Sequence, residues 1–153
     1  HNMEIFPKLI QQWKYEYNQE AGECIKQYVS NFLEDNQVFS IDIIVPVPLH
    51  RRRLAERGFN QAEQIARACA KKLCVPLLNI LIRTRYTSQQ AHLQREDRLK
   101  NLEDAFSVSS DIVGKRLLLV DDVFTTGTTL NECAQVLRQA GATSVVGFTV
   151  ARG

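Results

Sequence analysis

The sequence predicts an α/β domain with an open, twisted, mainly parallel sheet that is covered by helices on both faces. Three observations indicate this fold class: helix and strand patterns alternate, the strands are short and almost wholly apolar, and no boundary interrupts the 153 residues. Strands that are apolar on both faces are typical of parallel sheets, because helices cover both sides of such sheets. The length fits one domain with one substantial core.

The N-terminal part of the chain is predicted to be helical. Ile5, Leu9, Trp13 and Tyr17 recur at every fourth position, which indicates an amphipathic helix. The same periodicity predicts a second helix over residues 21–33.

The next part of the chain is predicted to hold two strands and a helix. The β-branched run 41–47 indicates a buried strand that ends in prolines. An arginine-rich loop follows, after which Asn60 and Glu63 have the form of a helix N-cap with its reciprocal acid. The helix that begins there is followed by a second apolar strand, residues 77–82.

The C-terminal part begins with a polar segment, residues 84–104, that is too long for an ordinary connection. A short strand is predicted over 105–108 and a buried apolar strand over 117–120. A helix over 128–140 and a last strand over 144–150 complete the alternation.

Charge and cysteine content limit the function only loosely. The net charge of +2 argues neither for nor against nucleic acid. The four cysteines form no CxxC pair and no apolar stretch is long enough to cross a bilayer, so we expect reduced thiols and a cytoplasmic protein without membrane insertion. Residues 1–3 are interpreted as a cloning remnant, which leaves a single domain over residues 4–153.

The most informative segment is LLLVDDVFTTGTTL, residues 117–130. Its apolar strand stops at Asp121 and Asp122, and ligands bind beyond the carboxyl ends of the strands in sheets of this kind. Two adjacent anions repel each other unless an electropositive group or a hydrogen-bond donor compensates them, and a metal or a vicinal diol supplies that.

A hydroxyl-rich loop follows the acids and leads into the predicted helix. Exposed N–H groups at a helix N-terminus attract an anion, and Gly127 permits a backbone conformation or a close approach that a Cβ atom would block. Diol acceptors beside a phosphate cradle describe a ribose 5-phosphate site. A threonine-rich helix cap is the alternative. The segment is not a Walker A loop, because no lysine follows the glycine.

This segment resembles the phosphoribosyl pyrophosphate (PRPP) motif of the type I phosphoribosyltransferases. The resemblance implies that Asp121 and Asp122 face the ribose 2- and 3-hydroxyls and that Mg²⁺ binds through the ligand rather than directly to the protein. The 5-phosphate is then expected at Thr125, Thr126, Gly127, Thr128 and Thr129.

Two other segments are predicted to complete the site. VPVPLHRRRLAERGFNQAE, residues 45–63, opens at the same edge of the sheet and offers donors to a pyrophosphate, although solvated surface charge is the alternative. The expected pyrophosphate-binding residues are His50, Arg51, Arg52, Arg53 and Arg57. The long polar connection is interpreted as a flexible lid rather than a solvated insertion. The expected lid residues are Arg83, Arg85, Gln90 and Arg98.

Together with LIQQWKYEYN near the N-terminus, these segments resemble the competence protein F (ComF/ComFC) family, which has a phosphoribosyltransferase-type domain. Family members commonly begin with a cysteine-rich zinc-binding segment, and these 153 residues contain none, so either the segment was removed or this member lacks it. The resemblance implies a role in natural transformation, in the handling of incoming single-stranded DNA. It suggests PRPP or a related phosphoribosyl ligand, single-stranded DNA and competence proteins as partners.

Three functions follow as hypotheses. The first is a PRPP-binding module, and the second is an active phosphoribosyltransferase that transfers phosphoribose to an unidentified acceptor and releases pyrophosphate. No catalytic residue is assigned for the second. The third, a phospho-acceptor receiver domain, is disfavoured because TTGTT directly follows the acids. Direct DNA binding has weak support, since Phe59 and Tyr86 are the sole aromatic residues beside the basic loops.

Overall fold

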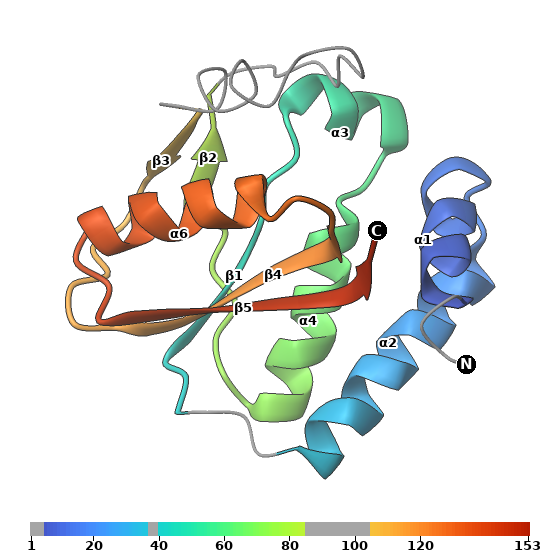
Figure 1. The fold of residues 1–153 in the computed structure, drawn as a ribbon, viewed down its shortest axis with the longest axis horizontal. Coiled ribbons are helices and arrows are strands. Elements are labelled where there is room, and N and C mark those ends of the chain that lie inside the picture. Colours follow the sequence, from blue (N-terminus) through green and yellow to red (C-terminus); the bar gives the residue numbers. More distant parts are fainter. Residues whose placement is uncertain (1–4, 37–39, 85–104) are drawn as a thin grey trace.

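A computed structural model of the chain describes residues 5–36, 40–84 and 105–153 (Figure 1). Its main sheet is parallel, with the order β1-β4-β5. The strands are β1 (Ile43–Pro46), β4 (Arg116–Phe124) and β5 (Ser144–Arg152). β4 is the central strand, and its residues 117–120 are apolar and buried, as expected for a strand covered on both faces.

The sheet is covered on both faces, which agrees with the predicted layers (Figure 1). One face packs against α1 (Ile5–Tyr15), α2 (Gln19–Asp35) and α4 (Gln61–Leu73). The other packs against α6 (Thr128–Gln139) and an antiparallel pair formed by β2 (Leu81–Arg83) and β3 (Phe106–Val108). None of the helices in the described part of the chain is long and apolar enough to span a membrane.

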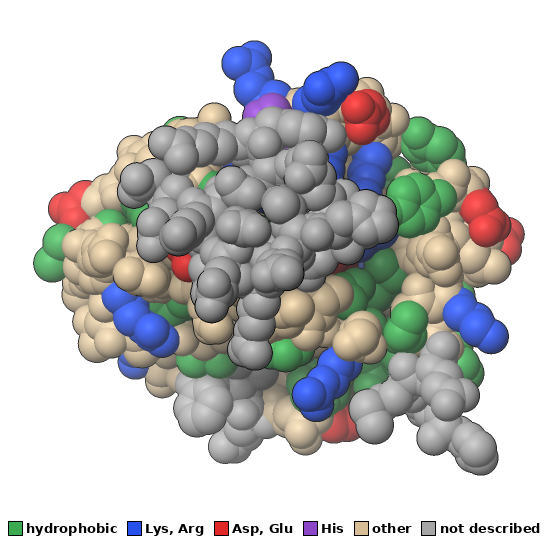
Figure 2. Space-filling view, turned by 45° about the horizontal axis from the view of Figure 1, so that its top comes forward, with side chains coloured by type: hydrophobic (Ala, Val, Ile, Leu, Met, Phe, Trp, Pro, Cys, Tyr) green, Lys and Arg blue, Asp and Glu red, His purple; other side chains and the backbone are tan. Residues whose placement is uncertain are grey.

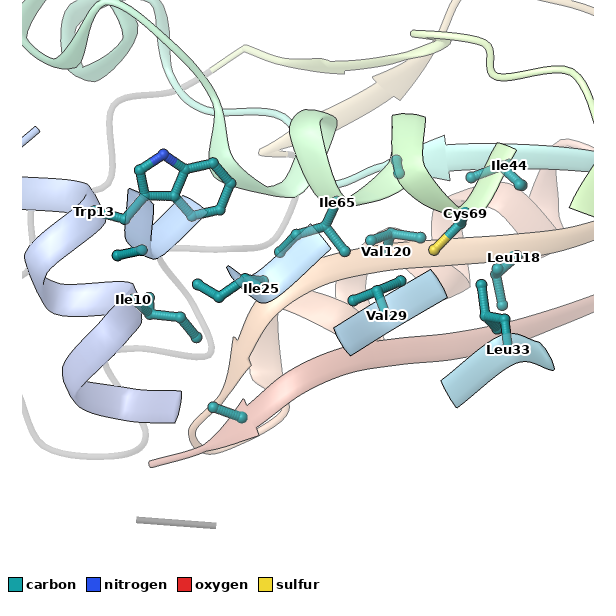
Figure 3. Close-up of a cluster of buried hydrophobic side chains, with 13 residues drawn as sticks. Ile10, Trp13, Ile25, Val29, Leu33, Ile44, Ile65, Cys69, Leu118 and Val120 are labelled. Atoms are coloured by element: carbon teal, nitrogen blue, oxygen red, sulfur yellow. The ribbon is translucent and has the colours of Figure 1, made fainter. Parts of the chain in front are cut away.

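The core on the α1–α2–α4 side fixes the position of α1 (Figure 3). Trp13 of α1 is buried together with Ile25 of α2, Ile65 of α4 and Val120 of β4. The indole also packs on Gly22 of α2, where a Cβ atom would lie 2.7 Å from the ring. The first helix is therefore held against the domain by its aromatic residue and by a glycine in its neighbour.

The first helix is shorter than predicted. It ends at Tyr15. The side chains of Ile5 and Tyr17 are exposed, and the buried residues of the helix are Ile10 and Trp13. The chain turns at Tyr17, whose φ is 54°, so that Asn18 can cap α2.

The arginine-rich segment is a short helix rather than the predicted loop. α3 spans Arg51–Arg57 and lies at one end of the molecule (Figure 1). Two caps define it, since His50 Nδ1 accepts the N–H of Arg52 at 3.2 Å and Gly58 adopts a left-handed conformation with φ of 78°. No apolar periodicity signals this helix in the sequence.

The predicted strand 77–82 is also wrong as a single element. Leu77 forms one parallel bridge with Ile44 of β1, and the chain then leaves the main sheet through the exposed residues Leu78 and Asn79. Residues Leu81–Arg83 pair instead with β3 in antiparallel register.

Candidate functional site

The paired acids lie inside β4 and not beyond its end. The strand continues through both residues to Phe124, and Asp121 pairs with Thr149 of β5. Because successive side chains of a strand point to opposite faces, the two carboxylates diverge. Asp122 lies on the side of α1, and the charge of Asp121 acts on Cys133 of α6 on the other side.

Asp122 forms an ion pair with Lys14 of α1. The distance between Asp122 Oδ2 and Lys14 Nζ is 2.5 Å, and the two side chains are 13% and 17% exposed. The compensating cation that two adjacent carboxylates require is therefore supplied by the protein itself.

Asp121 is in a different electrostatic environment. Its Oδ1 accepts the backbone N–H of Asp122 at 2.9 Å. Desolvation and the neighbouring charge of Asp122 raise the pKa of Asp121 to about 7, although this hydrogen bond and the cations of Lys14 and Arg83 oppose the rise. Near neutral pH the carboxyl group of Asp121 is thus divided between its protonated and ionised forms.

The threonine loop joins β4 to the N-terminus of α6. Gly127 has a φ of 75° and immediately precedes the helix, and a Cβ atom at this position would lie 2.7 Å from Cζ of Phe124. Gly127 thus has the left-handed backbone conformation that was one of the two alternatives predicted for it, and the nearby group is the ring of Phe124. The hydroxyl groups of Thr126 and Thr128 are 2.7 Å apart, and Thr125 and Thr126 are exposed.

The arginines of α3 separate into two pairs because of the helical periodicity. Arg51 and Arg52 are exposed, whereas Arg53 and Arg57, one turn apart, are half-buried. Arg57 packs over the ring of Tyr15 at 5.4 Å. Figure 2 shows basic side chains gathered over this end of the molecule.

A pocket of about 250 Å³ lies between α1 and α3. It is lined by Lys14, Tyr15, Tyr17, Arg53, Glu56 and Arg57. The lysine that pairs with Asp122 therefore also lines a pocket shared with the second arginine pair.

One of the predicted lid residues belongs to the body of the domain. Arg83 ends β2 and its guanidinium lies 5.4 Å over the ring of Phe106. Burial and the nearby charge of Arg53 lower the pKa of Arg83. The other expected lid residues, Arg85, Gln90 and Arg98, lie outside the described residues.

The Mg²⁺ that the fold family implies would be held through the phosphates of a bound ligand. The described residues contain no group of three or more His, Cys, Asp or Glu side chains that could hold a metal ion. Asp121 and Asp122 point to opposite faces of β4 and Asp122 is paired with Lys14, so the two carboxylates do not form a joint metal site.

Two residues of this region are not among the predicted site residues. Lys14 lies in the Lys-Tyr pair of the first helix, which entered the sequence interpretation only through the family resemblance. Gln61, at the start of α4, is 1% exposed and its Nε2 has no hydrogen-bond partner. A polar residue after an N-cap gives no sequence signal of such burial.

Comparison with known proteins defines the class of the domain. Residues 56–152 match the phosphoribosyl transferase domain family. The glutamine PRPP amidotransferase from B. subtilis superposes with a TM-score of 0.60 at 23% identity, over 85% of this chain and 26% of that one. Purine phosphoribosyltransferase from Pyrococcus horikoshii superposes with a TM-score of 0.50 at 17% identity, over 85% and 71% of the two chains. The chain has the type I phosphoribosyltransferase fold.

The sequence relatives narrow this class to one family. Competence protein F of Haemophilus influenzae is 32% identical in an alignment of 160 positions, which covers 99% of this chain and 70% of that protein. DNA utilization protein YhgH of Salmonella typhi is 41% identical over 105 residues, 68% of this chain and 46% of that protein. The chain therefore belongs to the competence protein F family, and the part that matches YhgH is about half of the length of that relative (46%).

Proposed function

We propose that this domain binds PRPP or a closely related phosphoribosyl ligand at the end of β4. The observation that carries the proposal is that the central strand β4 brings Asp121 and Asp122, one on each of its faces, directly before a hydroxyl-rich loop and the N-terminus of α6. Carboxylates accept hydrogen bonds from a vicinal diol, and a helix N-terminus attracts a phosphate. The spacing of these two groups along the chain suits the two ends of a ribose 5-phosphate.

The 5-phosphate is assigned to residues 125–129. The first turn of α6 presents backbone N–H groups, and its N-cap residue Gly127 has no side chain to bond them. The N–H of Thr128 donates to Thr126 Oγ1 at 3.4 Å, a long bond that a phosphate oxygen could replace. The exposed hydroxyls of Thr125 and Thr126 can add donors. No acidic residue occupies the first turn of this helix to compete with a phosphate.

The pyrophosphate is assigned to the end of the molecule formed by α3. Arginine side chains are suitable hydrogen-bond donors to phosphate oxygens, and Arg53 and Arg57 line the same pocket as Lys14. We also include His50, Arg51 and Arg52 as more peripheral contacts of the pyrophosphate. The Nδ1 atom of His50 already accepts a hydrogen bond that caps α3. Mg²⁺ would accompany the phosphates and neutralise part of their charge.

The biological role is proposed from the names of the relatives. Competence protein F and DNA utilization protein YhgH are named for competence and DNA utilization, and we place this chain in the same process, with single-stranded DNA and competence proteins as partners. The four free thiols fit a reducing compartment, which favours the cytoplasm.

Isothermal titration calorimetry tests the binding proposal. The protein is titrated with PRPP in the presence of Mg²⁺, and ribose 5-phosphate and AMP serve as comparison ligands. We expect saturable binding of PRPP, with weaker binding of ribose 5-phosphate. Heat no greater than the dilution of PRPP would refute the proposal.

Transfer of phosphoribose to an acceptor is the second candidate, favoured by the fold shared with a purine phosphoribosyltransferase. A pyrophosphate-release assay over a panel of nucleobases separates it from a binding module. Release that depends on one base identifies an enzyme, whereas binding without release identifies a module. A DNA-binding module would also show an affinity for single strands that falls steeply with salt.

A further inference from the structure

We propose that Lys14 is a diphosphate-binding residue that is held by Asp122 until the ligand arrives. The proposal rests on the proposed function, because it assigns the ligand at Asp122 to the phosphoribosyl class. In the ligand-free protein Lys14 neutralises Asp122. In the complex a ribose hydroxyl replaces the lysine at the carboxylate, and the ammonium group turns to the diphosphate.

The first support is the position of the ion pair. With side chains 17% and 13% exposed, Lys14 and Asp122 are more buried than the partners of any other ion pair in the described ranges 5–36, 40–84 and 105–153. A buried carboxylate without a cation or hydrogen-bond donors is costly, so the lysine leaves at least cost when another donor, such as water or a ligand hydroxyl, takes its place. A sugar hydroxyl is a suitable donor for this purpose.

The second support is the charge of the pocket next to the pair. Its lining has three cations, Lys14, Arg53 and Arg57, against the single carboxylate of Glu56. Glu56 in addition lies 3.8 Å from Arg52 on the outer side of α3. Cations gathered around one small pocket repel one another, and a multivalent anion relieves this repulsion.

The third support is the reach of the side chain. Lys14 both touches Asp122 and lines the pocket, so the ammonium group can move from one anion to the other without a backbone change. Lysine carries its charge on a flexible stem with three donors, which suits such an exchange. Tyr15, the next residue, is held by the guanidinium of Arg57 and keeps the end of α1 in place.

The experiment compares Lys14→Gln with wild type and with Lys8→Gln, a control on the exposed side of the same helix. Each protein is titrated with inorganic pyrophosphate, PRPP and ribose 5-phosphate in the presence of Mg²⁺. We expect Lys14→Gln to lose about tenfold or more in affinity for pyrophosphate and PRPP, a loss typical of removing a charged contact to an anion. Affinity for ribose 5-phosphate should change less than threefold, and Lys8→Gln should match wild type.

The outcomes separate this proposal from the proposed function. If wild type and Lys14→Gln bind PRPP with the same affinity, the proposed role of Lys14 is overturned and PRPP binding is retained. The same conclusion follows if Lys14→Gln loses affinity for ribose 5-phosphate and for PRPP to the same extent. If wild type binds pyrophosphate in a Lys14-dependent way but does not bind PRPP more tightly, the pocket is retained as a diphosphate site and the ribose assignment fails.

A second variant guards against a folding defect, because Lys14→Gln leaves Asp122 without its cation. The double variant Lys14→Gln with Asp122→Asn removes both charges and leaves two neutral side chains that can hydrogen-bond. We expect it to remain folded and still to lose affinity for pyrophosphate. Wild-type affinity for pyrophosphate in this variant would overturn the proposal.

Discussion

The indole of Trp13 in α1 packs directly on Gly22 in α2, where a Cβ atom would approach the ring to 2.7 Å. Trp13 is 2% exposed, so the ring has little space in which to move. This contact sets the distance between the two helices. It therefore determines whether the next residue, Lys14, can reach Asp122 on the central strand.

Gly22→Ala should loosen this arrangement. Overpacking against Trp13 costs about 1–3 kcal/mol, and the better helix propensity of alanine returns about 1 kcal/mol, so we expect a net loss of roughly 1 kcal/mol in the free energy of unfolding. Trp13 is the sole tryptophan of the chain, so its fluorescence reports the displacement directly. Cys24→Ala, at an exposed position of the same helix, is the control and should unfold like wild type.

The two aspartates should differ in their effect on stability. Asp122→Asn leaves the partly buried Lys14 without its counter-ion and should lower the free energy of unfolding by about 1–3 kcal/mol. Asp121→Asn removes a desolvated charge next to another carboxylate, so it should stabilise the protein above neutral pH. Urea unfolding measures the free energy of unfolding of both variants. A change of the same sign in the two variants would contradict the different environments of Asp121 and Asp122.

Both substitutions should nevertheless weaken the binding of PRPP, because each removes an acceptor for a ribose hydroxyl. The double variant Asp121→Asn with Asp122→Asn should show no measurable binding by calorimetry while its circular dichroism spectrum remains that of a folded protein. Unchanged affinity in a folded double variant would show that the ribose lies elsewhere.

The raised pKa of Asp121 predicts a specific dependence of stability on pH. In the unfolded chain an aspartate releases its proton near its ordinary pKa of about 4, whereas in the folded protein Asp121 holds its proton up to a pKa of about 7. The folded state binds more protons between these values, so the free energy of unfolding falls as the pH rises through this range and then levels off. Chemical unfolding at several pH values should show this slope, and Asp121→Asn should remove it.

Asp42 provides an internal contrast for the same measurement. Hydrogen bonds from Arg116 lower the pKa of Asp42 well below its ordinary value. Its contribution to stability is present above the ordinary aspartate pKa and is lost in acid. Asp42→Asn should therefore leave the slope between the ordinary aspartate pKa and neutral pH unchanged, which separates it from the effect of Asp121.

The parts of the fold that the sequence predicts well are those with a repeating apolar pattern. The periodicity of α2 and the apolar run of β4 each indicate their element, because burial on one or both faces leaves a period in the sequence. The segment around Asp121 and Asp122 is also recognisable, since its two acids and the TTGTT loop resemble the PRPP motif. The apolar pattern indicates the α/β class, and the resemblance to the PRPP motif implies the type I phosphoribosyltransferase fold, which the family match confirms.

The parts that it does not predict depend on caps and on contacts between distant segments. α3 is mostly charged and is bounded by caps at His50 and Gly58, which give no periodic signal. The ion pair between Lys14 and Asp122 joins the first helix to the fourth strand, so no local pattern can indicate it. The opposite directions of the two carboxylates depend on β4 continuing through them, which its apolar pattern does not require.

The arginines of α3 offer the final test, since the helix divides one basic run into two pairs. Arg53 and Arg57 line the pocket beside Lys14, whereas Arg51 and Arg52 are exposed. Replacing Arg53 and Arg57 with glutamine should lower the affinity for pyrophosphate by about tenfold or more, because charged contacts in a partly enclosed pocket are weakly screened. The same change at Arg51 and Arg52 removes an equal charge and should cost less than about threefold at physiological salt, where exposed charges are screened. Equal losses in the two double variants, measured by calorimetry, would show that the whole basic helix acts through its general field and that this pocket has no special role.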